Sequence, residues 1–209
     1  MILGVEQMSN PSPAATAILD ALLAVVDQQG LDRATVREVA STAGISIGTV
    51  QHYFPTKDAM LTAAFAEVVR RIRARIEGTL AGSDDVRANL SAVLRELLPL
   101  DERRRTEARI QIAFAARAAR SPALADLQRE VLTDVHQALT TAFALICDDE
   151  PDAPRCRLAA HAALALTDGL ALHAVSATGW LTEHDMTAAL DQFLETSPAN
   201  SANSAQLSI

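Results

Sequence analysis

The segment TVREVASTAGISIGTVQHYFPTKDA, residues 35–59, constrains the fold of this 209-residue chain more than any other. Thr35, followed three residues later by Glu38, predicts a capping box, in which the hydroxyl and the carboxylate each accept a hydrogen bond from an amide at a helix start. Apolar residues then recur at helical spacing until Gly44, which can adopt the positive φ of a helix end. A short helix followed by a tight turn is therefore expected here.

A second helix should follow this turn at once. Ser46 stands at the position of a helix cap, and Val50 and Phe54, four residues apart, are its expected inward residues. The other residues are mostly small or polar and point outward or along the helix edge: Ile47, Gly48, Thr49, Gln51 and His52. A helix that enters the major groove of DNA needs short residues where its backbone approaches and hydrogen-bonding residues near base edges, so this pattern is typical of a recognition helix.

The end of the segment predicts a phosphate contact. Pro55 ends the second helix, Thr56 caps the next one, and Lys57 lies in its first turn. The lysine charge and the free amides of that turn can both hold a phosphate group. We therefore expect two helix starts to face one DNA backbone.

These residues resemble the DNA-binding domain of the TetR family of bacterial transcriptional regulators. The similarity runs from about Ile18 to Phe65 and includes the block GTVQHYFPTKDAM, where glycine, threonine, tyrosine, phenylalanine and lysine stand at the family's positions. It implies that the partner is double-stranded DNA. The residues that it implies for phosphate contacts are Thr35, Thr49, Tyr53 and Lys57, and those for base contacts are Ile47, Gly48 and Gln51, with Ser46 and His52 as further members of the DNA-binding set. The implied core residues are Val39, Ala40, Ile45, Val50 and Phe54.

Two of these residues have simpler alternatives. Tyr53 could merely cover the flank of the domain, and His52 could be a solvated surface residue.

The DNA-binding segment is acidic. Up to Asp58 the chain carries three basic residues against six acidic ones, and the expected flexible arm, residues 1–11, contains no Lys or Arg. Affinity for DNA should therefore come from few phosphate contacts, and it should depend only weakly on salt concentration.

After Ala59 the pattern is helical throughout, with alanine, leucine and arginine dominant and no alternation of β-branched residues. Start and stop signals predict six helices, at about 57–80 with an end at Gly82, then at 85–98, 101–120, 122–147, 154–177 and 182–196. The polar tail, residues 197–209, should be disordered. The expected fold is all-α, with a three-helix helix-turn-helix domain at residues 12–58 and a six-helix ligand-sensing and dimerisation domain at residues 59–196.

The second domain carries a weaker resemblance to one TetR subgroup, which includes regulators of choline metabolism, in the segments LPLDERRRTEARIQIAFAARA and ALTDGLALHAV. The resemblance implies a homodimer in which the last two helices pair with their symmetry mates as a four-helix bundle. The expected interface residues are Ala160, Leu164, Asp168, Leu172, Leu190 and Phe193. The alternative is that the alanine-rich helix is only the core of a monomer.

A pocket for a small-molecule effector is expected in the same domain, largely apolar with a few polar groups. Its candidate residues are Gln111 and Phe114 on one helix, and His136, Thr140 and Phe143 on the next. Core packing explains the phenylalanines equally well. The domain has few aromatic residues for a cage around a quaternary ammonium ion, which argues against choline itself.

Composition argues against several other classes of protein. The chain is 49% hydrophobic, but polar residues interrupt its apolar stretches within a helix length, so we expect a cytoplasmic protein without a membrane span. Cys147 and Cys156 are too few for a disulfide framework, and His161 with Asp168 is too small a set for a metal site. No cofactor is expected. The five histidines and two cysteines lack a catalytic spacing, which argues against an enzyme.

The resemblance thus implies a transcriptional repressor that binds a palindromic DNA operator as a homodimer and is released by a small molecule. Two alternatives remain. One is a TetR-like protein whose DNA binding is lost or depends on a partner, as the acidic domain suggests. The other is an all-α enzyme or scaffold in which the helix-turn-helix serves only for packing.

Overall fold

The computed structural model describes residues 12–30, 33–80 and 84–197, and within these ranges the chain folds into nine α-helices without a strand. The predicted all-α class is confirmed, and the nine helices fit the expected three followed by six. The predicted N-terminal arm, the helix end at Gly82 and the whole of the predicted tail except Ser197 lie outside the described residues.

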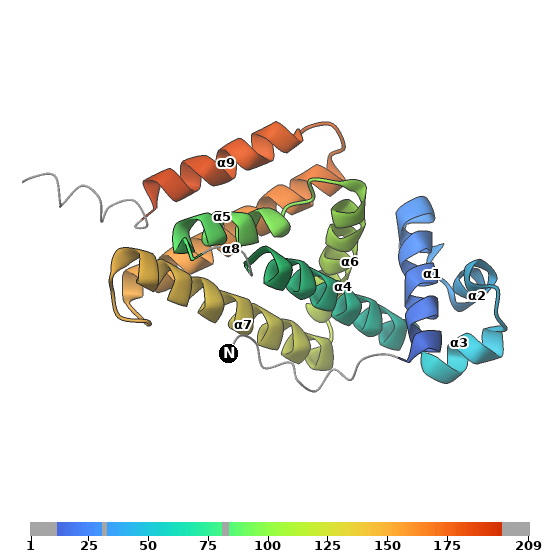
Figure 1. The fold of residues 1–209 in the computed structure, drawn as a ribbon. Coiled ribbons are helices and arrows are strands. Elements are labelled where there is room, and N and C mark those ends of the chain that lie inside the picture. The colour runs from blue at the N-terminus through green and yellow to red at the C-terminus, as the bar shows by residue number, and fades with distance from the viewer. Residues whose placement is uncertain (1–11, 31–32, 81–83, 198–209) are drawn as a thin grey trace, which may run out of the picture.

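The first three helices form a small cluster at one end of the molecule (Figure 1). They are α1 (Pro13–Gln29), α2 (Val36–Ala43) and α3 (Ile47–Tyr53). After α2, Gly44 adopts a φ of 66° and a ψ of 30°, the left-handed conformation that glycine reaches without a Cβ penalty. This turn packs α3 against α2 as a helix-turn-helix.

The start of α2 differs in part from the prediction. The Thr35 hydroxyl accepts a hydrogen bond from the Glu38 amide at 3.2 Å, as a capping box requires. The Glu38 carboxylate, however, accepts a hydrogen bond from Gln29 Nε2 at 3.0 Å, and the Thr35 amide donates to the Arg33 carbonyl at 2.7 Å. The second half of the predicted capping box is therefore wrong, because Gln29 at the end of α1 competes for the carboxylate.

The helix α4 (Lys57–Leu80) runs from this cluster into the rest of the molecule (Figure 1). Five more helices complete the fold: α5 (Val86–Glu96), α6 (Glu102–Ala118), α7 (Pro122–Cys147), α8 (Pro154–Ser176) and α9 (Glu183–Thr196). All six predicted helices are present. The helices α5 and α6 each end two residues before the predicted positions 98 and 120.

Three apolar clusters form the core. The first lies between α1, α2, α3 and α4 and includes Ile110 from α6. The second joins α5, α7, α8 and α9, and the third joins α4, α6 and α7 around the stacked rings of Phe65 and Phe114, whose centroids are 4.0 Å apart. Because α4 and α6 contribute to both the first and the third cluster, the helix-turn-helix cluster is packed directly onto the second domain.

One predicted core residue is misplaced. Ile45 is 36% exposed, since it directly follows Gly44 in a turn that runs over the surface. The other predicted core residues of this cluster are buried: Val39, Ala40, Val50 and Phe54.

Candidate nucleic-acid interface and ligand cavity

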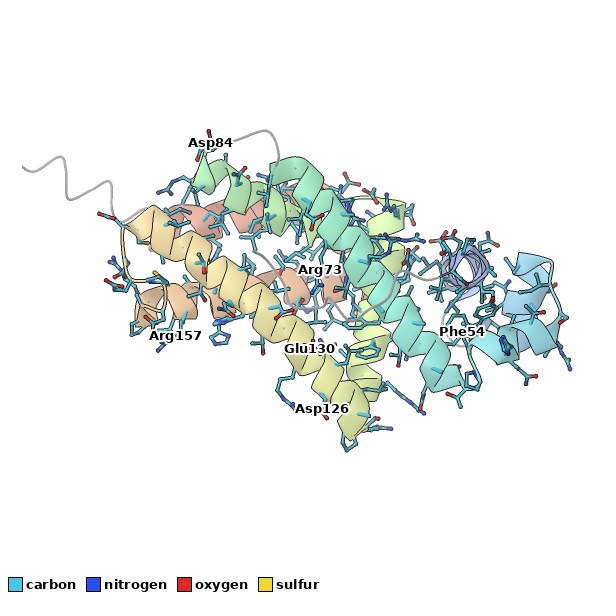
Figure 2. The ribbon with its side chains drawn as sticks, turned by 60° about the horizontal axis from the view of Figure 1, so that its bottom comes forward. Phe54, Arg73, Asp84, Asp126, Glu130 and Arg157 are labelled. Atoms are coloured by element: carbon cyan, nitrogen blue, oxygen red, sulfur yellow. The ribbon has the colours of Figure 1, made fainter. Side chains whose placement is uncertain are left out.

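The helix α3 is anchored by its two inward residues. Val50 is fully buried and Phe54, labelled in Figure 2, is 8% exposed, and both pack into the first core cluster. At the start of the helix, Ser46 Oγ accepts a hydrogen bond from the Thr49 amide at 3.0 Å and lies 2.8 Å from the Thr49 hydroxyl. These contacts fix which side of α3 points away from the protein.

The outward side of α3 carries the residues predicted to contact bases. Ile47, Gly48, Gln51 and His52 are all exposed, and their spacing places them on one side of the helix. Ile47 is 42% exposed although it is a large apolar residue. An exposed apolar side chain beside an amide group suits contact with a thymine methyl group and hydrogen bonds to base edges.

The residues predicted to contact phosphates border this side. Tyr53 is 37% exposed, and its ring meets the His52 ring edge-on with centroids 5.4 Å apart. Thr35 is exposed at the cap of α2, and Lys57 is exposed at the first position of α4. Thr49 is half-buried with its hydroxyl already hydrogen-bonded to Ser46, which makes it the least available member of the set.

Three acidic residues of the first 58 are paired with arginines of α4 and α6. One pair joins α4 to α6, where Arg117 donates two hydrogen bonds to Asp58 at 2.9 and 3.0 Å. The three pairs are Asp20 with Arg71, Asp27 with Arg109, and Asp58 with Arg117. These arginines offset part of the negative charge that the sequence assigns to this end of the molecule.

A cavity of about 290 Å³, the inner cavity, lies between α4, α6, α7 and α8. Its walls are mostly apolar, and its polar lining residues are Gln111, Gln128 and Asp168. Beside it lies the outer cavity, of about 680 Å³, which is open to solvent between α6, α7 and α8. Both cavities are lined by Ala115, Gln128, Leu132, Leu164 and Asp168, so they adjoin as parts of one site.

Asp168 lies where the two cavities meet. No described residue forms a hydrogen bond or an ion pair with its carboxylate. The many protein atoms around this carboxylate desolvate it and raise its pKa above the ordinary value of 3.8, although the residue is exposed by its solvent-accessible surface. A side chain at the mouth of an apolar cavity accounts for both observations.

Gln128 is the second unusual polar residue of the site. Its Oε1 atom is buried and has no hydrogen-bond partner among the described residues. A buried acceptor without a donor costs about 1–3 kcal/mol. The site therefore presents two acceptors, a carboxylate and an amide oxygen, that the described part of the protein leaves unpaired.

Two of the five predicted pocket residues line these cavities. Gln111 lines the inner cavity, and His136 lines the outer cavity, where its ring stacks on that of His161 with centroids 3.8 Å apart. Phe114 and Phe143 are instead fully buried in core clusters.

Thr140, also predicted to line the pocket, is buried and donates its hydroxyl hydrogen to the His136 carbonyl at 2.8 Å. Helical spacing does not distinguish a core face from a cavity face, which explains these misplaced residues.

Sequence reasoning missed Gln128, and it placed Asp168 at the dimer interface without predicting a cavity beside it. Asp168 is the only Asp, Glu, Lys or Arg between residues 158 and 176, and an isolated charge in an apolar helix is the signal that could have marked it. Gln128 offers no such signal, because a glutamine on a helix is ordinarily solvated.

The structure also divides the predicted interface residues. Ala160 and Leu190 are fully buried inside the protomer in the second core cluster, so their predicted place on the interface is wrong. Leu164, Asp168 and Leu172 line the cavities, Leu172 is also 43% exposed, and Phe193 is half-buried. The helix α8 is apolar on every side, so its sequence does not mark which side faces the protomer core.

A different stripe of α8 faces outward. Its members follow one another at alternate spacings of four and three residues: Leu158, Ala162, Ala165, Gly169, Leu172 and Ser176. All are exposed except Gly169, which is half-buried, and Leu158 is 68% exposed. Among the described helices, α8 alone is long and apolar enough to cross a membrane by length and composition, and 28% of its most apolar stretch is buried in the protomer. It packs against α6, α7 and α9.

Within the described ranges, no group of three or more His, Cys, Asp and Glu residues could hold a metal ion. His161 stacks on His136 and has no hydrogen bond to Asp168. Cys147 and Cys156 are free and buried.

Two families match the chain. Residues 18–64 match the family described as "Bacterial regulatory proteins, tetR family", and residues 86–198 match "BetI-type transcriptional repressor, C-terminal".

Individual proteins agree with these matches. The HTH-type transcriptional regulator BetI of Stenotrophomonas maltophilia is 31% identical over 73% of this chain and 76% of its own length, and that of Burkholderia mallei is 35% identical over 73% and 77%. The crystal structure of a transcriptional regulator from Rhodococcus sp. Rha1 superposes with a TM-score of 0.75 at 36% identity, covering 90% of this chain and 98% of its own. A regulator of Saccharomonospora viridis in complex with choline shares the fold, with a TM-score of 0.78, 20% identity and coverage of 87% and 95%.

Proposed function

The chain belongs to the TetR family of bacterial regulatory proteins, and on that premise we propose that it represses transcription by binding a palindromic operator as a homodimer until a small molecule releases it. Proteins of this family are transcriptional regulators and not enzymes. The exposed side of α3 is the main support for this proposal. We place the protein in the cytoplasm, where the chromosome lies.

In this proposal α3 enters the major groove. Gln51 reads a base edge through its amide, Ile47 contacts a base methyl group, and Gly48 lets the helix backbone approach closely. Thr35, Tyr53 and Lys57 hold the phosphates on either side. His52 lies on the same side as Gln51, where it can reach a base or a phosphate.

The dimer is proposed to form along the outward stripe of α8 together with α9. The small residues Ala162, Ala165 and Gly169 allow close approach of a partner helix, and Leu158 and Leu172 supply apolar area. A twofold axis through this stripe makes an isologous interface and pairs two copies of α3. The two half-sites of the operator would then lie about one helical turn apart, roughly 34 to 36 Å, or somewhat more.

The inner cavity is the proposed effector site. Its volume of about 290 Å³ lies near the lower end of the range usual for small-molecule pockets, roughly 300 to 1,000 Å³. Ligands of structural relatives differ widely, since the Saccharomonospora viridis regulator was solved with choline and the Bacillus subtilis regulator FadR with stearoyl-CoA. Family membership therefore does not identify the effector. Its chemistry has to be inferred from the residues that line the cavity.

Two helices connect this cavity to the DNA-binding cluster. The helix α4 lines it with Phe65 and begins at Lys57 beside α3. The helix α6 lines it with Gln111 and also places Ile110 in the first core cluster. A ligand that favours one packing of α4 and α6 would shift the population of dimers away from the spacing that fits the operator.

A TetR-like protein with partner-dependent DNA binding is the second candidate. The acidity of the first 58 residues favours it, although the arginine pairs of Asp20, Asp27 and Asp58 reduce that acidity.

Selection of binding sites from a random duplex library, with the purified full-length protein and nonspecific competitor, tests the proposal. We expect enrichment of a palindrome. If a folded dimer enriches no sequence, the partner-dependent alternative replaces the repressor proposal.

Variants of the contacts then separate their roles. Replacing Gln51 with alanine should change which sequence is enriched, whereas Lys57→Ala should weaken binding to all sequences alike. A Gln51→Ala variant with an unchanged sequence preference would remove Gln51 from the base-reading set.

A further inference from the structure

The polar groups of the effector cavity restrict the chemistry of its ligand more than its apolar walls do. The described residues that line the inner cavity include no Lys, Arg or His. Its one charged group is Asp168, which no described residue neutralises. A carboxylate, phosphate or acyl-CoA ligand would bring a second negative charge to this site, so the charge of the cavity favours a cation.

Arg129, His136 and His161 line the outer cavity together with Asp168, and among the described residues Arg129 is the one Lys or Arg of that lining. Its guanidinium is already held by Asp126, one turn earlier on α7, at 2.8 Å. Asp126 is exposed and labelled on α7 in Figure 2. The charge of Asp168 thus stays available to a ligand.

The buried Oε1 atom of Gln128 adds a second requirement. An amide oxygen without a partner among the described residues lacks a hydrogen-bond donor, and Gln128 lines both cavities, so a ligand that displaces the side chains covering Oε1 would supply that donor. A quaternary ammonium ion has no N–H group and cannot donate. It is recognised instead by several converging aromatic rings, and Phe65 is the only aromatic residue among the described residues that line the inner cavity.

From these observations we infer that the effector is a protonated amine with at least one N–H group, attached to an apolar body. The ammonium group pairs with the Asp168 carboxylate and donates to Gln128 Oε1, while the apolar body packs among Phe65, Leu132 and Leu164. This inference rests on the proposed function, since it gives the ligand chemistry of the same effector site.

The test compares ligands that differ only in the head group. We would titrate the full-length protein calorimetrically with n-hexylamine, n-octylamine and n-decylamine, and with the trimethylammonium, alcohol and carboxylate compounds of the same chain lengths. For at least one chain length the amine should bind about tenfold or more tightly than all three counterparts. Ligand binding should also raise the melting temperature in the same order.

Substitutions of Asp168 and Gln128 test whether these two acceptors cause the preference for the amine. Asp168→Asn should weaken amine binding by about tenfold or more, because a desolvated charge pair is lost, and should leave alcohol binding unchanged. Gln128→Met should reduce the preference for the amine over its trimethylammonium counterpart. Glu130→Gln is the matched control, since Glu130 is an exposed carboxylate of α7 that lines neither cavity, and it should change nothing (Figure 2).

The outcomes separate this inference from the function on which it rests. If the trimethylammonium or carboxylate compounds bind more tightly than the amines, and substitutions in the cavity weaken their binding, the effector site stands and the amine inference is wrong. An amine preference that survives Asp168→Asn would also overturn it. If none of the compounds binds, the amine inference fails, while selection of DNA sites still decides whether the protein is a sequence-specific regulator.

Discussion

Two glycines of the helix-turn-helix, Gly44 and Gly48, differ in whether the backbone conformation requires a glycine. Gly44 has a φ of 66°, so a side chain there would strain the turn whatever the surrounding space. Gly48 has no positive φ, and a Cβ added to it would meet only Ser46 Oγ, at an ordinary contact distance of 3.7 Å. The fold of the protomer therefore requires a glycine at 44 but not at 48.

Gly48→Ala should for this reason separate folding from DNA binding. Alanine in place of a helical glycine should stabilise the protein by up to about 1 kcal/mol, while the added methyl group should keep α3 from approaching the groove and weaken operator binding several-fold. Thermal unfolding and an electrophoretic mobility shift assay measure the two effects. Gly44→Ala is the contrasting variant and should lose stability, and a Gly48→Ala protein with unchanged operator affinity would show that the backbone does not approach DNA at this residue.

Asp168 should make the stability of the ligand-free protein depend on pH. Desolvation raises its pKa in the folded state, so the folded protein binds this proton more tightly than the unfolded chain does. Stability from this group is then greatest at low pH, where both states are protonated, and it falls as the pH rises through the ordinary value of 3.8 towards the raised value. Asp168→Asn should therefore melt at a higher temperature than the wild type near neutral pH.

This difference in melting temperature should shrink as the pH is lowered below the ordinary aspartate pKa. Glu130→Gln, which removes an exposed carboxylate, serves as the control and should follow the wild type. An Asp168→Asn protein less stable than the wild type at neutral pH would mean that the carboxylate has a stabilising partner.

At the scale of helices, α6 is the most direct link between the cavity and the DNA-binding cluster. The Thr106 hydroxyl donates a hydrogen bond to Asp27 of α1, and Arg109 Nη1 lies 3.5 Å from the same carboxylate. Two residues after Arg109, Gln111 lines the inner cavity. A movement of α6 that accommodates a ligand would therefore change the contacts of Asp27 near the end of α1.

Asp27→Ala should weaken this link without unfolding the protein. The Arg109 pair is partly exposed, which limits its contribution to stability to about 0–1 kcal/mol, and Thr106 keeps its hydrogen bond to the Glu102 carbonyl at 3.1 Å. The expected result is nearly unchanged affinity for the tightest-binding alkylamine but a smaller loss of operator affinity when that ligand is added. Fluorescence anisotropy of labelled operator, with and without ligand, measures it.

Asp191→Ala is a suitable control, because Asp191 pairs with Arg95 to join α9 to α5 and lines neither of the two cavities. If Asp27→Ala and Asp191→Ala respond to the ligand in the same way as the wild type, α6 is not the link.

Helix boundaries were predictable from sequence because local chemistry sets them. The capping box of Thr182 and Asp185 is present at the start of α9, and the Asp101 side chain accepts the Arg104 amide at the start of α6. Gly44 ends α2 as expected. Each of these signals acts within four residues along the chain.

The sides of the helices were less predictable, because distant residues set them. The sequence predicts Ala160 at the interface, but the residue is fully buried in the protomer, and it does not predict the cavity that the exposed Asp168 lines. Where apolar residues lie on most sides of a helix, the 3.6-residue period does not show which side faces the protein core. The pairing of Asp58 with Arg117 likewise joins residues 59 positions apart, so a count of local charge could not include it.

At the scale of the whole molecule, few cations are placed to meet DNA. Arg33, Arg37 and Lys57 are the basic residues of the first 58, and all three are exposed. The logarithm of affinity should therefore fall with the logarithm of salt concentration with a slope well below the value of about ten known for a heavily basic repressor. A slope near ten would contradict this view of the interface.

Lys57→Ala should lower that slope further. One phosphate contact contributes about 0.9 to the slope, so loss of the contact from both protomers of a dimer should remove roughly 1.8. Operator affinity measured over a range of salt concentrations gives the slope, and Arg120→Ala, which removes an exposed charge between α6 and α7, should leave it unchanged.

The assembly of two protomers determines whether two copies of α3 can meet one operator. Gly169 lies in the middle of the outward stripe of α8, and a Cβ added there would meet no atom of the protomer within 4 Å. A larger side chain at this position therefore fits the isolated protomer. It would clash only with a partner helix that packs closely on the same stripe.

Gly169→Leu should accordingly convert the dimer to a monomer while the protomer keeps its helical content, because leucine favours a helix more than glycine does. Gly78→Leu is the matched control, since Gly78 also lies in a helix, α4, with no protomer atom within 4 Å of the added Cβ. Sedimentation velocity gives the mass of each variant, and the Gly169→Leu protein should also lose affinity for the full palindrome. A Gly169→Leu dimer as tight as the Gly78→Leu dimer would place the twofold axis on another surface, and the spacing expected for the operator would change with it.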